Sequence, residues 1–452
     1  MIENITYDEL LLKIILLLRD GKRKDFRELI EELQPYDMAS IFKEMPEKHY
    51  ARFLSFMTVD DITALIQELE RPYQLALFNK VGKAKGVQVM NKMDNDDLAQ
   101  LLEELDAELK EQLLSSMEQK ESEAVQTLMN YPPETAGRIM TNRYVWIPKH
   151  YTVRDAVSKL KSFAEIAESI NYLYVINEEK QLVGVISYRD LILGEREELI
   201  EEIMYTRVIS IQADADQEEV ARLIERYDFL ALPVVEENHV LVGIVTVDDV
   251  IDIVIQEANE DYEKFAASGK SIDFDTKAFT AAYRRLPWLI LLLFIGLVSG
   301  SIISFFEGTL NEVVALAFFM PMIAGMTGNT GTQSLAVVVR GLAQNDLDSK
   351  MIWRLILREL RVGLLIGMVC GILITGIAVI WQGTPLLGLV VGSSLFLTLI
   401  IGTMAGTVIP ILLDRLKIDP AIASGPLITT LNDILSLLIY FGLASSFLQH
   451  LK

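Results

Sequence analysis

Long apolar stretches dominate the C-terminal part of the chain. They are Leu286–Phe306, Val313–Val339, Val362–Leu413 and Pro420–Leu451, and Asp433 is the only charged residue in them. A helix that spans a bilayer needs about 20 consecutive apolar residues. The third stretch is long enough for two such helices, which the turn sequence Trp381–Pro385 would separate. The pattern predicts five transmembrane helices, because a buried helix of a soluble protein explains one such run but not five in series.

A gapless repeat of 12 residues runs through positions 39–117. Two columns of the repeat, three residues apart, hold only apolar side chains in seven copies. They are Phe42, Leu54, Ile66, Phe78, Met90, Leu102 and Leu114, and Met45, Met57, Leu69, Val81, Met93, Leu105 and Met117. A spacing of three residues is helical, and helix breakers such as Pro46, Pro72 and Gly82 fall between the copies. We expect short helices that wind into a superhelix and cover one another's apolar faces.

A second, different repeat follows. Residues 173–187 align without a gap to residues 232–246, and both segments contain two apolar runs around a polar turn and a shared Leu-Val-Gly motif. Ile139-Met140-Thr141 and Ile203-Met204-Tyr205-Thr206 precede the two copies. Each copy predicts a strand, a turn, a second strand and the start of a helix.

The segment from Val247 to about Ala278 leads from this repeat to the first apolar stretch. Val250, Val254, Ala258, Tyr262 and Phe265 form an apolar stripe at helical spacing, and acidic residues fill the other faces. A long helix here would connect the soluble part to the membrane part.

The net charge of -22 is distributed unevenly. Residues 284–452 carry 10 basic and 8 acidic residues, so the first 283 hold 31 of the 41 basic and 55 of the 63 acidic residues, a net charge of -24. This acidity disfavours nucleic acid as a partner and favours cations, although acidic surfaces also serve solubility alone. The single cysteine, Cys370, excludes a disulfide framework or a Cys/His metal cluster. No phosphate-binding loop, HExxH or GxSxG motif is present, so we do not expect an enzyme.

Basic residues set the expected orientation in the membrane. Lys and Arg precede the first span and lie between spans 2 and 3 and between spans 4 and 5, whereas Glu307–Glu312 and Trp381–Pro385 have none. The N-terminal segment, Met1–Leu10, does not resemble a signal peptide. We expect a cytoplasmic N-terminus and an outer C-terminus near His450.

Asp433 is the most informative single residue. A carboxylate inside a span is costly and is by default a functional site. Thr429, Thr430 and Asn432 add oxygens beside it, which suits Mg²⁺, an ion that keeps several of its waters. One Asp per chain is little for a divalent ion, so a two-fold dimer that presents two Asp433 carboxylates is a natural inference. The alternative is a carboxylate bonded to a neighbouring helix for packing.

The polar, glycine-rich run Pro321–Ser334 in the second span has two interpretations as well. Such a segment at membrane depth must face protein or water, so it lines a path or lets helices pack closely.

The double repeat resembles the tandem cystathionine-β-synthase (CBS) module, a small α/β disc that often binds adenine nucleotides or ions. The whole order of segments is similar to the MgtE family of bacterial magnesium channels, whose hallmarks resemble Pro321–Ser334 and Asp419–Pro426 followed by Thr429, Thr430 and Asp433. The resemblance implies a multidomain chain, described by four predicted parts. These are an all-α superhelical N-terminal domain (1–132), α/β tandem CBS domains (133–250, divided as 133–198 and 199–250), a connecting plug helix (251–282) and a five-helix transmembrane domain (283–452).

The resemblance also implies the function and the site. It implies a homodimer in the bacterial inner membrane, a pore on the two-fold axis where Asp433 holds hydrated Mg²⁺, and closure by intracellular Mg²⁺ bound between the acidic cytosolic parts. The candidate metal ligands besides Asp433 are Asp419, Asp94, Asp96, Asp97, Gly137, Asp216, Glu218, Asp228, Asp249, Asp252, Glu257, Glu260 and Asp261. Tyr172 and Arg189 are the candidates for contact with ATP.

Two other functions remain open from the sequence. A proton- or sodium-coupled carrier of divalent cations, including Co²⁺, Mn²⁺ or Zn²⁺, would also use a membrane carboxylate. A signalling protein that senses nucleotide and uses the helices as an anchor is the third.

Overall fold

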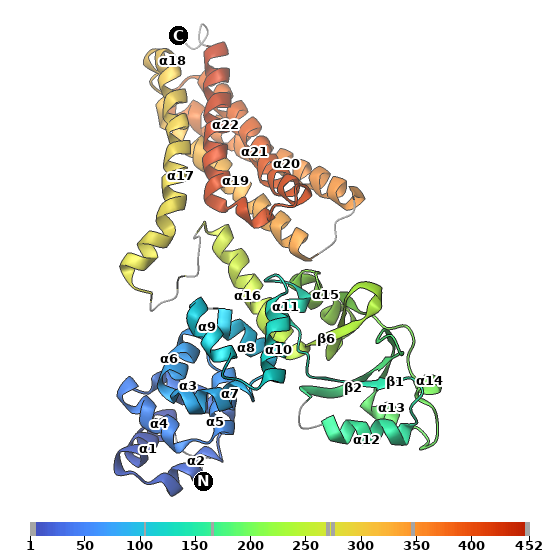
Figure 1. Ribbon diagram of the computed structural model, residues 1–452. Coiled ribbons are helices and arrows are strands. Elements are labelled where there is room, and N and C mark those ends of the chain that lie inside the picture. Colours follow the sequence, from blue (N-terminus) through green and yellow to red (C-terminus); the bar gives the residue numbers. More distant parts are fainter. Residues whose placement is uncertain are drawn as a thin grey trace. The chain divides into compact units, whose positions relative to one another are not determined.

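The computed structural model describes residues 6–103, 105–163, 167–267, 272, 276–344 and 349–447, so the predicted outer C-terminus near His450 lies outside the described residues. The chain forms two compact units, residues 1–255 and 256–452 (Figure 1).

The first unit begins with short helices joined by tight turns. They are α1 (Tyr7–Asp20), α2 (Arg23–Ile30), α3 (Pro35–Glu44), η1 (Glu47–His49), α4 (Tyr50–Phe56), α5 (Val59–Gln67), α6 (Arg71–Val81), α7 (Lys83–Met90), α8 (Asn95–Glu103), α9 (Ala107–Leu114) and α10 (Gln119–Met129). The two apolar columns of the 12-residue repeat are mostly buried in their shared core, with Phe42, Ile66 and Leu102 fully inaccessible. The predicted helical superhelix is therefore confirmed.

The CBS region consists of two three-stranded sheets with helices around them. The first copy contains α11 (Ala136–Ile139), β1 (Tyr144–Pro148), α12 (Val153–Phe163), β2 (Ser169–Ile176), β3 (Leu182–Ser187) and α13 (Tyr188–Leu193). The second contains α14 (Ile200–Ile203), β4 (Ile211–Gln212), α15 (Gln217–Tyr227), β5 (Ala231–Val235), η2 (Glu237–His239) and β6 (Leu241–Thr246). In each sheet the first two strands are parallel and the last two antiparallel.

The repeated glycine of the two copies has a packing reason. Gly184 on β3 lies against the side chain of Met204, and Gly243 on β6 lies against that of Met140, so that a Cβ at either position would overlap the methionine. Backbone bridges cross between the copies at the same places, because Thr141 pairs with Ile244 and Tyr205 pairs with Val185. The segment just before the first strand of each copy therefore joins the sheet of the other copy.

The connecting helix is shorter than the predicted segment. α16 spans Val247–Phe265, and the next helix, α17, begins at Ala278. Ala267 has a left-handed φ of 55° just after α16, a conformation that ends a helix. The acidic helix therefore does not run continuously into the first apolar helix.

The second unit is a bundle of long helices. They are α17 (Ala278–Phe305), α18 (Glu307–Glu312), α19 (Leu316–Gln344), α20 (Ser349–Gln382), α21 (Pro385–Arg415), η3 (Pro420–Ile422) and α22 (Gly425–Ser446). Among the described residues, α17, α20, α21 and α22 are long and apolar enough to cross a membrane. α19 is equally long but carries the polar, glycine-rich run. Gly383, with a φ of +71°, makes the predicted turn between α20 and α21.

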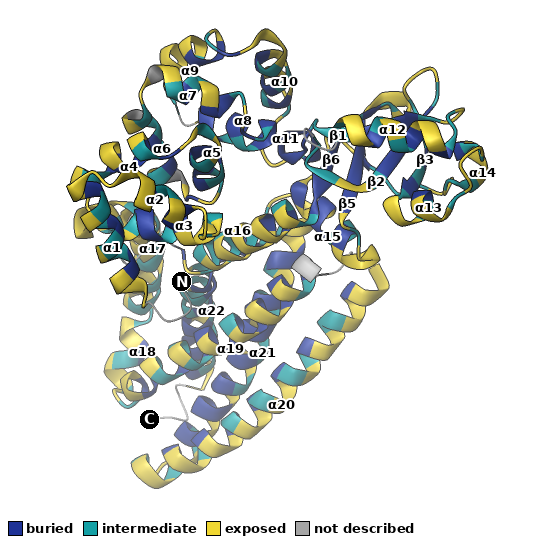
Figure 2. Ribbon diagram, turned by 90° about the horizontal axis from the view of Figure 1, so that it is seen from below, coloured by how far each residue is buried: buried dark blue, intermediate teal, exposed yellow. Residues whose placement is uncertain are grey.

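Burial is uneven among these helices (Figure 2). α21 has buried residues along its length, whereas α17 has none and α20 exposes large apolar side chains such as Leu365, Ile372 and Ile380. Exposed apolar faces of this kind suit lipid or another chain.

Glycines bring α19, α21 and α22 into close contact. A Cβ on Gly331 of α19 would lie 3.1 Å from the carbonyl oxygen of Gly402 on α21 and 3.0 Å from Ile428 on α22, and a Cβ on Gly406 would overlap the carbonyl group of Gly331. Small residues at such crossings let backbones approach, so the packing interpretation holds for this face of α19.

This crossing yields a testable prediction. Gly406→Ala forces the backbones of α19 and α21 apart, and overpacking of this kind costs about 1–3 kcal/mol. We expect a lower thermal midpoint of the detergent-solubilised protein. Gly376→Ala on α20 is the matched control, because a Cβ there meets no atom within 4 Å. Equal midpoints for the two variants would contradict the assignment.

Candidate ion path and cation sensor

Asp433 lies half-buried near the middle of α22. Its backbone carbonyl accepts a hydrogen bond from the Ser436 hydroxyl at 2.9 Å, but its carboxylate makes no hydrogen bond or ion pair with any other described residue. The interpretation that Asp433 is bonded to a neighbouring helix for packing thus receives no support here. Thr430 lies three residues earlier on the same side of α22 and is partly exposed. The two form a polar stripe on a helix of the bundle.

Asn432 does not share this stripe. It is fully buried, its Nδ2 donates to the carbonyl oxygen of Thr327 on α19 at 3.3 Å, and its Oδ1 has no partner among the described residues. Its side chain fills the space beside Gly331. Asn432 therefore acts at the helix crossing. Contrary to the prediction, the structure does not place its amide with the Asp433 carboxylate.

The polar run of α19 divides between two faces. Thr327, Thr330 and Ser334 are buried, whereas Gly325, Asn329 and Gln333 lie exposed at intervals of four residues. The buried side of α19 therefore packs within the bundle, whereas its exposed side carries a separate set of polar groups. The exposed side is the one whose polar groups need water or another protein surface.

Glu359 on α20 is a buried acid that the sequence did not single out. It is 5% exposed, accepts a hydrogen bond from the Ser334 hydroxyl at 3.0 Å and pairs with Arg358 at 2.9 Å. In the sequence it stands among the basic residues before the third span, where an acid is unremarkable. Only the contact with Ser334 reveals that it ties α20 to the buried face of α19.

In the first unit, carboxylates from three segments lie near one another. Asp96 of α8 is 2% exposed, Glu168 precedes β2, and Asp249 is in the first turn of α16. The Thr246 hydroxyl contacts both Glu168, at 3.2 Å, and Asp249. One oxygen of Asp96 and one of Glu168 are buried without a hydrogen-bond partner among the described residues. Orphaned buried oxygens of this kind need water or a cation.

The pKa values reflect this crowding. Burial, then the nearby carboxylates of Glu168 and Asp249, raises the pKa of Asp96 well above its usual range. Burial raises the pKa of Glu168 to about 8, although a hydrogen bond with Thr141 acts in the opposite direction. The pKa of Asp249 is raised to about 7, mainly by burial, against its bond with Thr246. Negative charge at this place is therefore unfavourable without a counter-ion.

Asp94 and Asp97 lie beside this group but have partners. Gln67 donates to both carboxylates, and Arg143 is 3.5 Å from Asp94. Glu168 is the member that sequence reasoning missed, since its loop shows no motif.

The other predicted ligands of this unit include three residues with local structural roles and one exposed residue. Asp216 caps α15 by accepting from the Glu218 amide at 2.8 Å, and Asp228 ends the same helix with a left-handed φ of 53°. The 11 residues of α15 place its ends roughly 16 Å apart, so Asp216 and Asp228 of one chain do not share an ion. Gly137 is held against the Tyr131 ring and donates its N–H to Ala213 at 2.8 Å. Asp252 is exposed on α16.

In the second unit, the end of α16 lies near the segment before α22. Lys264 pairs with Glu260 at 2.5 Å and with Asp419 at 2.6 Å. Asp261 is close enough that, after burial, the Asp419 carboxylate is the main cause that raises its pKa. The structure thus brings together three of the predicted ligands, and it places a lysine among them. Glu257 is partly buried on the same helix.

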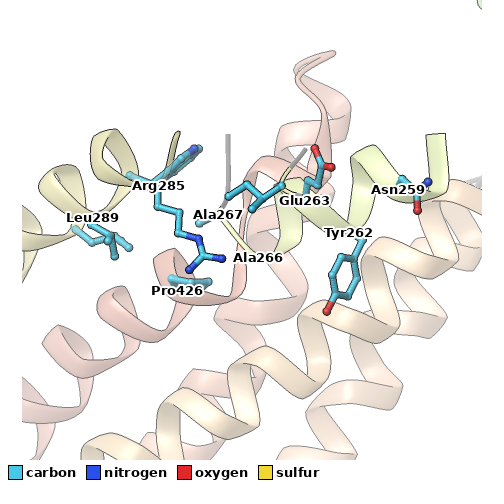
Figure 3. A pocket seen from close by; sticks show the side chains of 11 residues that line it. Asn259, Tyr262, Glu263, Ala266, Ala267, Arg285, Leu289 and Pro426 are labelled. Carbon is cyan, nitrogen blue, oxygen red and sulfur yellow. The ribbon is translucent and has the colours of Figure 1, made fainter. Parts of the chain in front are cut away.

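Both units contain a cavity. One, of about 260 Å³, lies between the two CBS copies and is lined by aromatic rings, among them Tyr172 and Tyr174, and by Arg207. Arg189, the other predicted ATP contact, is exposed on α13 and does not line it. The second, of about 640 Å³, lies beside the end of α16, where the Arg285 side chain extends toward Pro426 and Ala266 (Figure 3).

No group of three or more His, Cys, Asp or Glu side chains converges as a preformed metal site within the described ranges.

Comparison with known proteins decides the family. The profile of the MgtE divalent cation transporter family matches residues 320–443, that of the MgtE intracellular N domain matches residues 12–85 and 33–134, and that of the CBS domain matches residues 136–195 and 200–256. The chain is 75% identical over 451 residues to the magnesium transporter MgtE of Bacillus subtilis, with 100% of each chain covered. The chain belongs to the MgtE family of magnesium transporters. This family is not one of enzymes, as the sequence predicted.

More distant MgtE relatives agree. The chain is 38% identical over 441 residues to the magnesium transporter MgtE of Thermus thermophilus, with 96% of this chain and 97% of that protein covered. A structure of the soluble part of a magnesium transporter matches 56% of this chain and 100% of its own, at 34% identity and a TM-score of 0.53. The cytosolic domain of the Mg²⁺ channel MgtE in complex with ATP matches 54% of this chain and 99% of its own, at 32% identity and a TM-score of 0.52. The predicted order of superhelix, CBS pair and apolar helical region is confirmed.

The raised pKa values predict how the soluble part of this MgtE protein responds to pH. Glu168 and Asp249 bind protons more tightly when folded than when unfolded, because their folded pKa values, about 8 and about 7, exceed unfolded values near 4. The free energy of unfolding therefore falls as pH rises from about 4 to about 8 and levels off above. One pKa unit corresponds to about 1.4 kcal/mol, so we expect a loss of a few kcal/mol in a chelator.

Thermal unfolding of residues 1–267 at a series of pH values checks this prediction. Glu168→Gln should flatten the loss, whereas Glu178→Gln, in an exposed turn, should leave it unchanged. An equally steep loss in Glu168→Gln would rule out this acid as its source.

Proposed function

We propose that this magnesium transporter is a dimeric channel for hydrated Mg²⁺ that closes when intracellular Mg²⁺ binds between its acidic cytosolic parts. Asp433 carries the proposal. Its carboxylate lies on a membrane helix without an ion pair or a hydrogen bond to another described residue. A carboxylate kept unpaired at such cost is expected to meet a cation.

The open faces of α19 and α22 support a dimer. Asn329 and Gln333 on α19, and Thr430 and Asp433 on α22, are at least partly exposed in one chain. Polar groups at membrane depth do not face lipid. A second subunit related by two-fold symmetry would cover these faces and place two Asp433 carboxylates at one axis.

Hydrated Mg²⁺ suits such a path better than a bare ion. Two carboxylates supply charge, and the hydroxyl of Thr430 and the amides of α19 are groups that can bind the waters of the ion. Mg²⁺ retains several waters when it binds one or two carboxylates.

Closure follows from the charges of the cytosolic parts. The first 283 residues carry a net charge of -24, so their domains repel one another in the absence of counter-ions. The crowded carboxylates of Asp96, Glu168 and Asp249 and the trio of Glu260, Asp261 and Asp419 are places where a divalent cation lowers that repulsion. An ion shifts the gate by as much as it prefers the closed state, and several weak sites together give a steep response.

We also infer that the cavity between the CBS copies binds ATP as a regulatory ligand. Tyr172 and Tyr174 provide ring surfaces, Arg207 provides a positive charge for phosphate, and the buried Tyr174 hydroxyl has no partner among the described residues. A related cytosolic domain was solved with ATP.

Flux through purified protein in liposomes tests the proposal. We expect Mg²⁺ uptake that persists without a proton or sodium gradient and that falls as Mg²⁺ on the cytosolic face rises. Uptake that requires a proton or sodium gradient would favour a coupled carrier, and no uptake at all would favour a membrane-anchored sensor. The predicted five spans and the cytoplasmic N-terminus are tested in the same vesicles by cysteine labelling from either side.

A further inference from the structure

The carboxylates at the end of α16 already have a cation, which is the ammonium group of Lys264. Its Nζ is 2.5 Å from Glu260 and 2.6 Å from Asp419. Glu260 is one helical turn before Lys264 on α16, whereas Asp419 belongs to the segment before α22. The lysine therefore joins two separate segments of the second unit.

Asp419 is oriented for this contact. Its Oδ1 accepts a hydrogen bond from the Ala421 N–H at 2.8 Å, which leaves Oδ2 toward Lys264. The side chains of Lys264, Glu260 and Asp419 are 33%, 39% and 32% exposed. None of the three is sealed from solvent, so a dissolved ion reaches the carboxylates and the ammonium is free to leave into water.

We propose that Lys264 is a tethered monovalent cation that makes this sensor site specific for divalent ions. The inference rests on the proposed function, in which Glu260, Asp261 and Asp419 bind regulatory Mg²⁺. A potassium or sodium ion that replaces the ammonium brings no additional charge and competes with a group held nearby by its own chain. A divalent ion brings twice the charge and a preference for carboxylate oxygens, so it displaces the ammonium.

The same contact has a simpler explanation, which the test must separate. Lys264 would then only clamp α16 to the segment before α22, with no exchange against ions. Removal of a clamp weakens the closed arrangement, so that more Mg²⁺ is needed for closure. Removal of a competitor has the opposite sign, because the carboxylates then bind Mg²⁺ without displacing anything.

Lys264→Met removes the charge and keeps the length of the side chain, and Lys264→Arg keeps the charge. Lys24→Met is the matched control, since Lys24 pairs with Glu28 at the same helical spacing but without a third group. The full-length variants are compared in liposomes by the Mg²⁺ concentration that halves the flux. Ionic strength is held constant while K⁺ replaces N-methylglucammonium, a much bulkier monovalent cation.

For Lys264→Met we expect half-closure at an about two- to fivefold lower Mg²⁺ concentration, the range that an exposed ion pair sustains. This midpoint should rise again as K⁺ increases, whereas K⁺ should not affect wild type, Lys264→Arg or Lys24→Met. An unchanged midpoint, or one shifted to higher Mg²⁺, overturns the proposal. Wild-type flux that ignores Mg²⁺ overturns the proposed function instead, and calorimetric Mg²⁺ titration of the same variants in detergent then shows whether Lys264→Met binds more tightly.

Discussion

Asp433→Asn is expected to reduce Mg²⁺ uptake in liposomes to the level of protein-free vesicles. The amide has the shape of the carboxylate but lacks its charge, so it no longer offsets the desolvation of a divalent cation in the membrane. The helix itself should persist, because the Asp433 carboxylate makes no hydrogen bond or ion pair with another described residue that the change would break. Uptake of ²⁸Mg²⁺ or quenching of an internal Mg²⁺ dye measures the effect.

Asp414→Asn provides the matched control. Asp414 is exposed near the end of α21, so the same substitution there removes a charge without touching the path. We expect wild-type uptake from it and an unchanged elution volume for both variants. Normal uptake by Asp433→Asn would move the ion site elsewhere and remove the main support for the proposed channel.

Periodicity explains why much of the fold was predictable. The 12-residue repeat places apolar residues such as Phe42 and Ile66 at a constant spacing, so each copy has one apolar face. Stacking the copies buries the apolar faces of all of them. The second repeat fixed the CBS pair through its strands and turns. The predicted connecting helix was extended past Phe265, where α16 ends, although the apolar stripe stops at that residue and Ser268-Gly269 follows in the sequence.

The candidate site was predictable where one residue is costly by itself. Asp433 stands out because a charge within a span is rare. Contacts between distant segments leave no such mark, so Glu168 beside Asp96 and Glu359 beside Ser334 escaped notice. Sequence also does not show which side of a helix packs against its neighbours. For this reason Asn432, which is adjacent to Asp433, was expected to share its surroundings.

The acidic residues illustrate the same limit in another way. Sequence shows how many carboxylates a segment carries but not which of them already have a counter-charge. The spacing of Glu260 and Lys264 suggests a helical pair, yet the part of Asp419 requires the tertiary structure. The number of acidic residues in a segment is therefore an upper limit on the number of its carboxylates that are available to bind a cation.

Neutralisation of α16 should give the second large effect. The triple variant Asp249→Asn, Asp252→Asn, Glu257→Gln removes three α16 carboxylates that the family resemblance implies as Mg²⁺ ligands, and Asp249 also belongs to the crowded group with Asp96 and Glu168. With fewer carboxylates to bridge, Mg²⁺ favours the closed state less. We therefore expect half-closure to need about tenfold more Mg²⁺, or closure not to occur. A tenfold change is a usual magnitude for the coupling between two sites. Flux in liposomes at increasing Mg²⁺ on the cytosolic face measures this.

The control must remove equal charge from a place that binds no ion in this scheme. Glu178, Glu179 and Glu237 are exposed at the turns of the two CBS hairpins. Their triple replacement by Gln removes the same number of negative charges as the α16 triple. If closure depended only on general repulsion between acidic domains, both triples would shift it equally, because the repulsion depends on total charge. A shift confined to the α16 triple assigns the effect to its carboxylates, whereas normal closure in that variant would exclude α16 as part of the sensor.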